Sequence, residues 1–189
     1  MKETSKCYNL RKQRGDFHKY LRGSGIDIGC GDDCLRVEHG TVRPWDIPDG
    51  DAQTLPGVAD ASFDFVYSSH CLEHMRNVEE SLTHWLRVLK PGGTLYTVVP
   101  EYILYEKMVW PSRFNIDHKQ SFSFLIPRAK VMRDNHFHVE ADLFPLLERL
   151  GAEPIDFLVE DLGFNYNFGM VDHTLLGGLA QICFIARKR

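Results

Sequence analysis

The glycine-rich stretch at residues 25–31 constrains the fold of this chain more than any other feature. It reads Gly-Ile-Asp-Ile-Gly-Cys-Gly, so two β-branched residues are followed directly by two glycines. β-Branched residues favour a strand, and glycine allows a loop whose backbone has a positive φ or lies close to a bound group. The stretch therefore predicts a short buried strand that runs into a tight loop. In an open α/β sheet such a loop faces a ligand; the alternative is a glycine turn without one.

The residues around this loop argue against a dinucleotide ligand. The dinucleotide-binding fingerprint has a third glycine three residues after the second, and Cys34 occupies that position. Asp32 and Asp33 would also repel a pyrophosphate. The loop therefore favours a ligand with a cationic or hydroxyl-rich part over NAD or FAD.

The composition indicates an ordinary globular protein. Of 189 residues, 43% are hydrophobic and 25% are charged, so we expect a single domain with a substantial core. The net charge is -4, and two short basic clusters, one with Arg11, Lys12 and Arg14 and one at residues 187–189, are expected to be solvated surface. We therefore expect no nucleic-acid partner. Five cysteines without a Cys-x-x-Cys pair favour the cytoplasm, and no apolar run has the length that a membrane span needs.

Periodicity and turn residues divide the rest of the chain into strands and helices. Asn77 is a good N-cap with Glu80 three residues later, which predicts a helix that ends at the Lys-Pro-Gly-Gly turn of residues 90–93. A shorter helix is expected over residues 142–150. Further strands are expected at residues 42–47 (an edge strand, because of Pro44), 62–69, 94–99, 155–159 and 181–186. This order predicts a mostly parallel α/β sheet whose last strand pairs as a hairpin.

Residues 102–138 follow no single period and are rich in aromatic and polar side chains. We therefore expect an insertion or lid there, and not a framework element. Its aromatic side chains could stack on a sugar or a planar substrate, or they could form a small local core.

Five motifs, in order between residues 25 and 100, together resemble the class I S-adenosylmethionine-dependent methyltransferases of type 11. They are Ile-Asp-Ile-Gly-Cys-Gly at 26–31, Asp46 after the second strand, Gly-Asp-Ala at 50–52, Ser-Phe-Asp-Phe-Val with Ser-His-Cys-Leu-Glu-His at 62–74, and Arg-Val-Leu-Lys-Pro-Gly-Gly at 87–93. The segment at residues 110–119 is also similar to one found in glycan-associated methyltransferases.

The resemblance implies one methyltransferase domain over residues 1–189 with a Rossmann-like, mostly parallel, seven-stranded sheet. The implied strand order is 3-2-1-4-5-7-6 with an antiparallel last strand. The second helix is reduced, because no room for it exists between Asp46 and Asp51. Residues 102–138 would be an insertion after the fifth strand that covers the substrate.

The resemblance also implies S-adenosylmethionine as the cofactor and S-adenosylhomocysteine as the product. Asp46 would accept hydrogen bonds from the ribose hydroxyls, and Asp51 with the Ala52 amide would hold the adenine edge. The other implied cofactor-binding residues are Asp27, Gly29, Cys30, Gly31, Ser69 and His70. Asp27 has two readings, either near the cofactor's ammonium group or as a buried carboxylate that ties the loop amides together. The reduced helix, and Asp33 where the family has its third glycine, predict a more open adenine side.

Three residues are candidates for the chemistry. Methyl transfer is an in-line displacement that needs a closely held acceptor, and a base helps when the acceptor is a hydroxyl. His70 follows the fourth strand and acts as a base or contacts the cofactor. His118 with Asp117 could form an oriented base, although an ordered polar loop is the alternative. His74 is expected to cap or pack the start of the helix.

No metal site is predicted. His136 and His138 place two imidazoles on one side of a strand and, with Asp117 or His118, could hold a divalent ion. A structural role for this pair is favoured.

The leading functional hypothesis is transfer of a methyl group from S-adenosylmethionine to an oxygen of a small-molecule or glycan acceptor. The second is a regulatory or scaffold protein that binds S-adenosylmethionine without catalysis, motivated by the reduced helix and the altered loop. A third, an NAD-linked oxidoreductase, is disfavoured by the loop aspartates. The sequence identifies neither the acceptor nor the oligomeric state.

Overall fold

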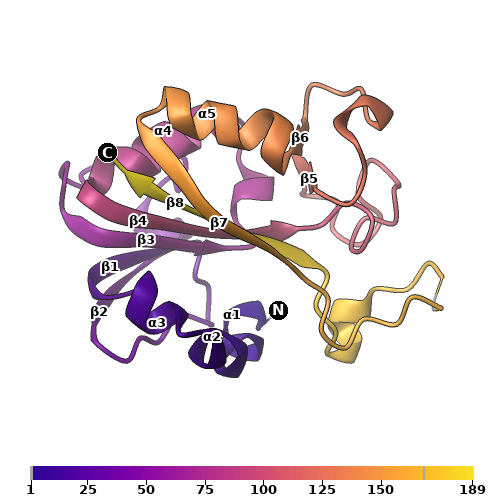
Figure 1. Ribbon diagram of the computed structural model, residues 1–189, viewed down its shortest axis with the longest axis horizontal. Helices are drawn as coiled ribbons and strands as arrows, with labels where there is room; N and C mark the ends of the chain where they lie inside the picture. The colour runs from indigo at the N-terminus through magenta and orange to yellow at the C-terminus, as the bar shows by residue number, and fades with distance from the viewer. Residues whose placement is uncertain (1, 168) are drawn as a thin grey trace.

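The computed structural model describes residues 2–167 and 169–189 and is built on a six-stranded sheet (Figure 1). The strand order is β2-β1-β3-β4-β8-β7. The strands are β1 (Gly23–Ile28), β2 (Gly40–Trp45), β3 (Phe63–Ser69), β4 (Leu89–Pro100), β7 (Ala152–Glu160) and β8 (Gln181–Lys188). The four neighbouring strands β2, β1, β3 and β4 are parallel to one another, and β8 is antiparallel to both β4 and β7. Two short strands, β5 (Ser121–Ser123) and β6 (His136–His138), form a second, parallel sheet.

Helices cover both faces of the large sheet (Figure 1). The α-helices are α1 (Glu3–Lys6), α2 (Tyr8–Arg14), α3 (Asp16–Lys19), α4 (Val78–Val88) and α5 (Phe144–Arg149). The shorter helical turns are η1 (Ile47–Asp49), η2 (Leu72–His74), η3 (Arg128–Lys130), η5 (His173–Leu176) and the π-helix η4 (Val139–Leu143). In Figure 1, α1, α2 and α3 lie on one side of the sheet and α4 and α5 on the other.

Two hydrophobic clusters fill the space between the layers. In β3, Phe65 and Tyr67 belong to the cluster that includes Phe17 of α3, whereas Val66 belongs to the cluster that includes Trp85 of α4. Alternation with a period of two is expected for a strand that is buried on both faces. The sheet therefore lies between two apolar layers, and only its strand ends and loops are available for a site.

Most of the expected elements are confirmed. The Asn77 side chain accepts a hydrogen bond from the Glu80 amide at 3.1 Å and caps α4. β2 lies at an edge of the sheet, as Pro44 predicts. The last two expected strands are β7 and β8, and β8 is antiparallel. The helix expected over residues 142–150 is α5, preceded by the π-helix η4. The Pro-Gly-Gly turn lies inside β4, which begins directly after α4 at Leu89.

The seven-stranded sheet is the expectation that the structure corrects. The described residues between β2 and β3 form the 3-10 helix η1 and turns, so the outermost strand of the expected order is missing. Pro48, Gly50, Pro56 and Gly57 interrupt this segment, and proline and glycine both weaken a strand. The reduced second helix is confirmed, because η1 is three residues long.

Arg11 is fully buried, which corrects the expectation that its basic cluster is solvated surface. Its guanidinium lies 5.1 Å from the ring centre of Tyr67 and 5.9 Å from that of Tyr96. Its Nη1 donates a hydrogen bond to the Thr4 carbonyl at 2.8 Å. Lys12, the next residue of the helix, remains exposed. Arg11 therefore fastens the N-terminal helices to the sheet.

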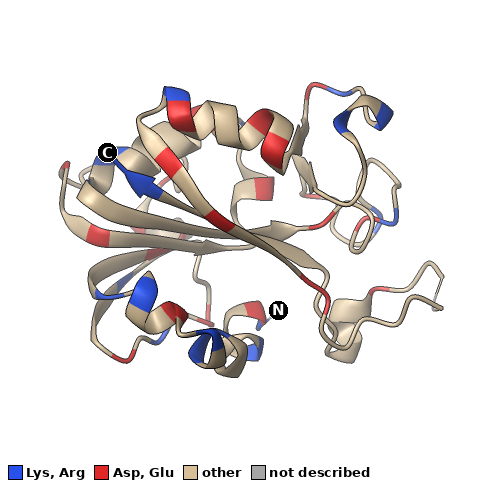
Figure 2. Cartoon of the chain, viewed as in Figure 1, with Lys and Arg blue, Asp and Glu red and all other residues tan. Residues whose placement is uncertain are grey.

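Glu101 fastens the segment after β4 to the sheet. Its side chain is fully buried, and its carboxylate accepts hydrogen bonds from four backbone amides, those of Ile103, Leu104, Phe124 and Leu125. Phe122 of the same segment belongs to the main hydrophobic cluster. Residues 102–138 are therefore anchored to the domain core through Glu101 and Phe122. In Figure 2, acidic and basic residues are interspersed along the helices and loops.

Two residues shape the loop after β1. Gly29 has a φ of +77°, and a Cβ at this position would lie 2.5 Å from Sγ of Cys71, so the loops after β1 and β3 approach too closely for a side chain. Asp27 is 1% exposed, and its Oδ2 accepts a hydrogen bond from the Leu35 amide at 2.6 Å. Of the two readings of Asp27, the structure supports the carboxylate that ties down the loop. Burial raises its pKa to about 7, although the Leu35 amide and the Arg11 charge act in the opposite direction.

We expect Asp27→Asn to remove a pH dependence of folding stability. The pKa of Asp27 is higher in the folded protein than its ordinary value of 3.8, so the folded state binds more protons between about pH 4 and about pH 7. The stabilisation is complete at the acidic end of this window and is lost as the pH rises through it. A shift of about three units corresponds to about 4 kcal/mol.

Urea unfolding at several pH values measures this effect in the wild type and the variant. Asp134→Asn, a change at an exposed position, is the matched control and should keep the wild-type pH dependence. A wild-type slope in Asp27→Asn would show that this carboxyl does not carry the effect.

Candidate active site

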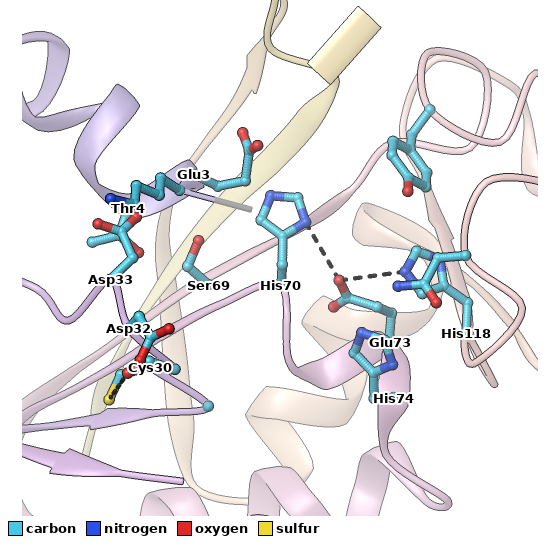
Figure 3. Close-up of a pocket in the computed structure, with 15 residues that line it drawn as sticks. Glu3, Thr4, Cys30, Asp32, Asp33, Ser69, His70, Glu73, His74 and His118 are labelled. Atoms are coloured by element: carbon cyan, nitrogen blue, oxygen red, sulfur yellow. Dashed lines mark hydrogen bonds and ion pairs between the residues drawn. The ribbon is translucent and has the colours of Figure 1, made fainter. Parts of the chain in front are cut away.

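Two adjoining cavities lie beyond the carboxyl ends of β1 and β3. The smaller has a volume of about 340 Å³ and the larger about 660 Å³, and both are lined by Gly29, His70 and His74. In the sheet, β2 lies on one side of β1 and β3 lies on the other. The strand order therefore reverses its direction at β1, and the cavities lie at this topological switch point. Open α/β sheets bind their ligands at such a point. Figure 3 shows the side chains around the smaller cavity.

The loop after β1 forms one wall, and Asp46 holds it in place. Gly29, Cys30 and Gly31 line the smaller cavity. Oδ2 of Asp46 accepts a hydrogen bond from the Gly31 amide at 2.5 Å, and Oδ1 accepts one from the Ile47 amide at 2.7 Å. Asp46 itself lines the larger cavity. Its carboxylate is therefore oriented at the boundary between the two cavities.

The far end of the larger cavity is lined by Asp51 and Ala52. Oδ2 of Asp51 accepts a hydrogen bond from Arg76 at 2.6 Å, and Oδ1 accepts one from the Gln53 amide at 2.8 Å. These contacts, led by that with Arg76, lower the pKa of Asp51 and keep it charged. A ligand that donates a hydrogen bond to the Asp51 carboxylate would share that carboxylate with Arg76.

Ser69 and His70 lie where β3 ends, on the wall of the smaller cavity. His70 has a φ of +54°, a conformation that is uncommon for residues other than glycine. Its Nε2 lies 2.8 Å from Oε1 of Gln181, and its Nδ1 lies 3.4 Å from Oε1 of Glu73. Burial acts to lower the pKa of His70, but the neighbouring Glu73 carboxylate outweighs it and raises the pKa. Both ring nitrogens thus face protein groups, which makes His70 a poor base.

Glu73 is a buried carboxylate that the sequence analysis quoted only as part of a motif. It is 1% exposed, and its carbonyl accepts hydrogen bonds from the Lys119 and Gln120 amides at 2.8 and 3.0 Å. Neither of its carboxylate oxygens has a hydrogen-bond partner within residues 2–167 and 169–189. Burial acts to raise its pKa, but His70, followed by His118 and His74, lowers it overall. The site therefore contains a charged carboxylate among three imidazoles (Figure 3).

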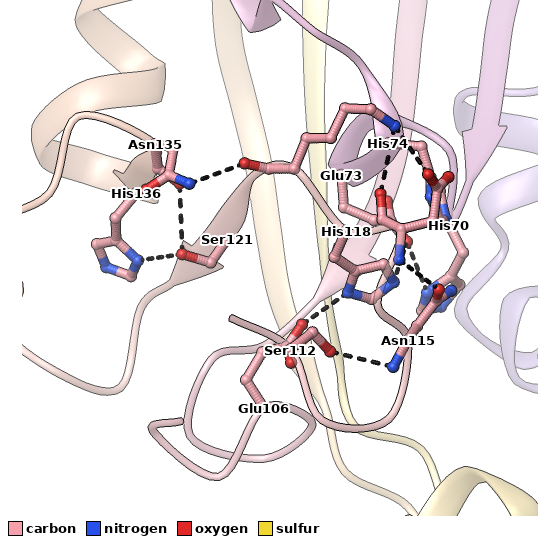
Figure 4. Close-up of polar contacts among 12 residues, drawn as sticks. His70, Glu73, His74, Glu106, Ser112, Asn115, His118, Ser121, Asn135 and His136 are labelled. Atoms are coloured by element: carbon pink, nitrogen blue, oxygen red, sulfur yellow. Dashed lines mark hydrogen bonds and ion pairs between the residues drawn. The ribbon is translucent and has the colours of Figure 1, made fainter. Parts of the chain in front are cut away.

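The structure changes the expected partner of His118. Its Nδ1 lies 2.7 Å from Oε1 of Glu106, and its Nε2 faces Glu73 at 3.9 Å (Figure 4). Asp117, expected beside His118, is exposed and instead pairs with Nδ1 of His74 at 2.9 Å. His118 lines the smaller cavity and Asp117 the larger one. His118 is thus oriented by a carboxylate, although not by the one expected.

His136 and His138 do not join His118 or Asp117 in a metal site. The two ring nitrogens of His136 lie 2.8 and 2.9 Å from the hydroxyls of Ser121 and Ser123, and burial lowers its pKa to about 4. Nδ1 of His138 accepts a hydrogen bond from the Ala141 amide. Both side chains hold together the small sheet and the helix that follows it.

Several residues of the site carried no signal in the sequence. Glu3 and Thr4 of α1 line the smaller cavity. Tyr105 and Asn115 line it too, but they lie in the segment that the sequence predicts to cover the substrate. No periodicity or motif relates the start of the chain to the loop after β1, because their contact depends on tertiary packing. Glu106 stands twelve residues before His118, a separation that has no meaning in a regular helix or strand.

Comparison with known proteins finds a similarity to methyltransferases over part of the chain. A family model described as a methyltransferase domain matches residues 35–97. The chain is 34% identical over 92 residues to the biotin biosynthesis bifunctional protein BioHC of Cellvibrio japonicus (48% of this chain, 18% of the relative). It is 29% identical over 149 residues to the ubiquinone/menaquinone biosynthesis C-methyltransferase UbiE of Laribacter hongkongensis (77% of this chain, 55% of the relative). The chain therefore spans about half, or less, of the length of these curated relatives.

The fold agrees with this match. A solved SAM-dependent methyltransferase of Methanosarcina mazei superposes with a TM-score of 0.53 over 92% of this chain and 96% of its own, at 18% identity. In the described residues, no helix has the length and apolar character needed to cross a membrane. Over residues 35–97 the chain is therefore similar to methyltransferase domains, and its fold is that of a solved SAM-dependent methyltransferase.

Proposed function

We propose that the chain transfers the methyl group of S-adenosylmethionine to an oxygen atom of a small-molecule or glycan acceptor. The observation that carries the proposal is the cluster of Glu73, His74 and His118, which lies beside the loop after β1 and faces the same cavity. A hydroxyl acceptor needs polar groups of this kind around its oxygen, both to orient it and to remove its proton.

The residues of the cleft fit the cofactor. Asp46 offers an oriented carboxylate to the ribose diol, and Asp51 with the Ala52 amide offers an acceptor and a donor to the adenine edge. Ser69 Oγ and Glu3 Oε2 are buried, line the smaller cavity and have no hydrogen-bond partner within the described parts of the chain, so they are available to the methionine part. The wall between the ribose and methionine parts of the cofactor would be the backbone of Gly29, Cys30 and Gly31. Asp27 acts behind this surface by holding the loop.

The reaction is a displacement at the sulfonium methyl. The acceptor oxygen forms a bond to the methyl carbon while the carbon–sulfur bond breaks, and its electron pair stays on sulfur, giving S-adenosylhomocysteine. We assign activation of the acceptor hydroxyl to the cluster, with His118 oriented by Glu106 and Asp117 acting through His74. His70 is assigned to the cofactor side, because both of its nitrogens face Gln181 and Glu73.

The insertion at residues 102–138 is proposed to cover the acceptor. It contributes Tyr105, Asn115 and His118 to the smaller cavity. Tyr105 is buried, and its ring lies against both Phe114 and His118. An aromatic ring beside polar groups suits the ring face and hydroxyls of a sugar.

Two other functions compete with this one. UbiE is named as a C-methyltransferase, so a carbon acceptor is the first alternative. A binding protein without catalysis is the second, and the observation that favours it is the short segment after β2, which lacks the outermost strand and leaves the adenine side open.

We expect Asp46→Asn to weaken binding of S-adenosylmethionine by about 10- to 100-fold. Hydrogen bonds to a charged group contribute about 1.5–3 kcal/mol, and asparagine keeps the shape but not the charge. Titration calorimetry with S-adenosylmethionine and S-adenosylhomocysteine measures both affinities. Asp60→Asn, at an exposed position away from the cleft, is the matched control. If the wild type bound neither compound, the proposed function would be wrong.

We expect His118→Ala to lower turnover at least tenfold, because proton transfer by a positioned side chain typically contributes about 10²- to 10⁴-fold. The affinity for S-adenosylmethionine should change little, because Asp46 and Asp51 remain. Release of S-adenosylhomocysteine is followed with methyl glycosides, nucleotide-linked sugars and catechols as acceptors, and mass spectrometry locates the new methyl group.

His84→Ala is the control for this experiment, since His84 lies on α4 outside both cavities. Turnover in His118→Ala equal to that of the control would remove His118 from the reaction. A new methyl group on carbon would show that the oxygen acceptor is wrong and that the carbon acceptor is right. Cofactor binding without any methylated product would favour the binding protein without catalysis.

A further inference from the structure

Three side chains of the cluster meet at a distance that suits a metal ion. Glu73 and His74 come from the 3-10 turn η2 after β3, and His118 comes from the insertion. Each offers one ligand atom, and these atoms all lie within 4.8 Å of one another. Figure 4 shows Glu73, His74 and His118 directed toward one another from the two segments.

Each of the two histidines is oriented by a carboxylate. Nδ1 of His74 lies 2.9 Å from Oδ2 of Asp117, and Nδ1 of His118 lies 2.7 Å from Oε1 of Glu106. This leaves Nε2 of each ring as the nitrogen for a ligand, and Nε2 of His118 lies 3.9 Å from Glu73. A histidine that binds a metal characteristically has its other nitrogen hydrogen-bonded to a carboxylate, which fixes the tautomer and the ring orientation. Both histidines of the cluster meet this condition.

Within residues 2–167 and 169–189, the third side chain, Glu73, makes no hydrogen bond through its carboxylate and is paired with imidazoles alone, with Nδ1 of His70 at 3.4 Å and Nε2 of His118 at 3.9 Å. It is 1% exposed. Burying a charge without hydrogen bonds costs several kcal/mol unless the charge is paired or binds a metal. The Lys119 and Gln120 amides bind the Glu73 carbonyl, so the two segments that carry the ligands are also joined through the backbone.

We propose that Glu73, His74 and His118 bind one zinc-like divalent metal ion beside the cofactor cleft. Two imidazoles and one carboxylate are a ligand set of catalytic zinc sites, which keep a further position open. Imidazole nitrogen favours zinc and its first-row neighbours over magnesium or calcium. The open position faces the smaller cavity, which all three residues line.

The role of the metal rests on the proposed function. The acceptor hydroxyl would bind the ion at its open position, where a metal lowers the pKa of a bound oxygen. With Nε2 bound to the ion, His118 acts as a ligand and no longer as the base, and the proton leaves to water. The oxygen forms its bond to the methyl carbon, and the carbon–sulfur bond breaks with its electron pair left on sulfur. The acceptor class that fits best has two neighbouring hydroxyls, since a diol can bind one ion through both oxygens.

Two other groups of residues have ligand atoms that are close enough for a metal ion, but their surroundings do not favour binding one. His18, Glu38 and His39 include two exposed histidines, and Glu38 is paired with Lys12 at 2.8 Å. Asp27, Cys30 and Cys34 form the other group. Asp27 already accepts a hydrogen bond from the Leu35 amide, and burial, the largest influence, raises the pKa of Cys30 to about 12, which disfavours the thiolate that zinc binds.

The test uses the untagged full chain, stripped with a chelator and dialysed against buffered Zn²⁺. We expect one tightly bound zinc per chain by plasma mass spectrometry. Glu73→Gln should lose it. Asp117→Asn, which removes the charge that orients His74 together with an exposed ion pair to Lys119, should weaken zinc binding about 10- to 100-fold. His39→Ala, in the exposed group, is the matched control and should bind zinc as the wild type does.

A second measurement needs no variant, because replacing the buried Glu73 could affect folding. X-ray absorption of the zinc-loaded wild type should show two imidazole ligands and no sulfur. Sulfur ligands would place the ion at Cys30 and Cys34 and overturn the proposal. So would a wild type that takes up no zinc, or zinc content that is unchanged in both Glu73→Gln and Asp117→Asn.

The same samples separate this proposal from the proposed function. Calorimetry with S-adenosylmethionine reports on the cofactor cleft, which needs no metal. Cofactor binding and turnover that persist after chelation would leave methyl transfer standing and refute the role of the metal in it. Zinc binding at the three residues without cofactor binding would refute methyl transfer and leave the metal site.

Discussion

The close approach of the loops after β1 and β3 is the constraint on which the rest of the site depends. A single Cβ at Gly29 would overlap Cys71, so the two loops lie in contact with no side chain between them. This contact sets the boundary of the cleft at the switch point of the sheet. The Asp46 side chain then links the Gly-Cys-Gly loop to the end of β2 through the Gly31 amide. The Asp27 side chain links the same loop to β1 through the Leu35 amide. The cavity wall thus consists of backbone whose position is fixed from three sides.

Beyond this wall, the polar groups are organised around one buried carboxylate. Glu73 attracts His70 from the loop after β3 and His118 from the insertion, and its carbonyl accepts hydrogen bonds from the amides of residues 119 and 120. Glu101 fastens the other end of the same insertion to β4 through four amides. The insertion has an irregular sequence, but these two acids fix its position. A charged group without hydrogen bonds is unfavourable in a core, and such groups are found mainly where they bind something.

Local sequence patterns predicted most of the framework and several of the residues that line the two cavities. The strand and glycine loop at residues 25–31, the cap at Asn77 and the acid at Asp46 depend on neighbours in sequence, so composition and spacing reveal them. The missing outer strand was not foreseen, because the family order suggested a strand that the prolines and glycines after β2 do not allow. The pairing of His118 with Glu106, the burial of Arg11 and the position of Glu3 depend on contacts between distant segments, which no local pattern encodes.

The packing of the N-terminal helices has a consequence for protein synthesis. Glu3 and Thr4 line the cleft, and the residues just after them contact the other end of the chain: Lys6 donates a hydrogen bond to the Thr174 carbonyl, and Gln181 of β8 donates one to Cys7. A ribosome makes residues 3–7 well before their docking partners Thr174 of η5 and Gln181 of β8. The cleft can therefore be completed only after β8 has left the ribosome and joined the sheet between β4 and β7. A nascent chain that stops before β8 would carry the glycine loop and its acids but lack one wall of the cofactor cleft.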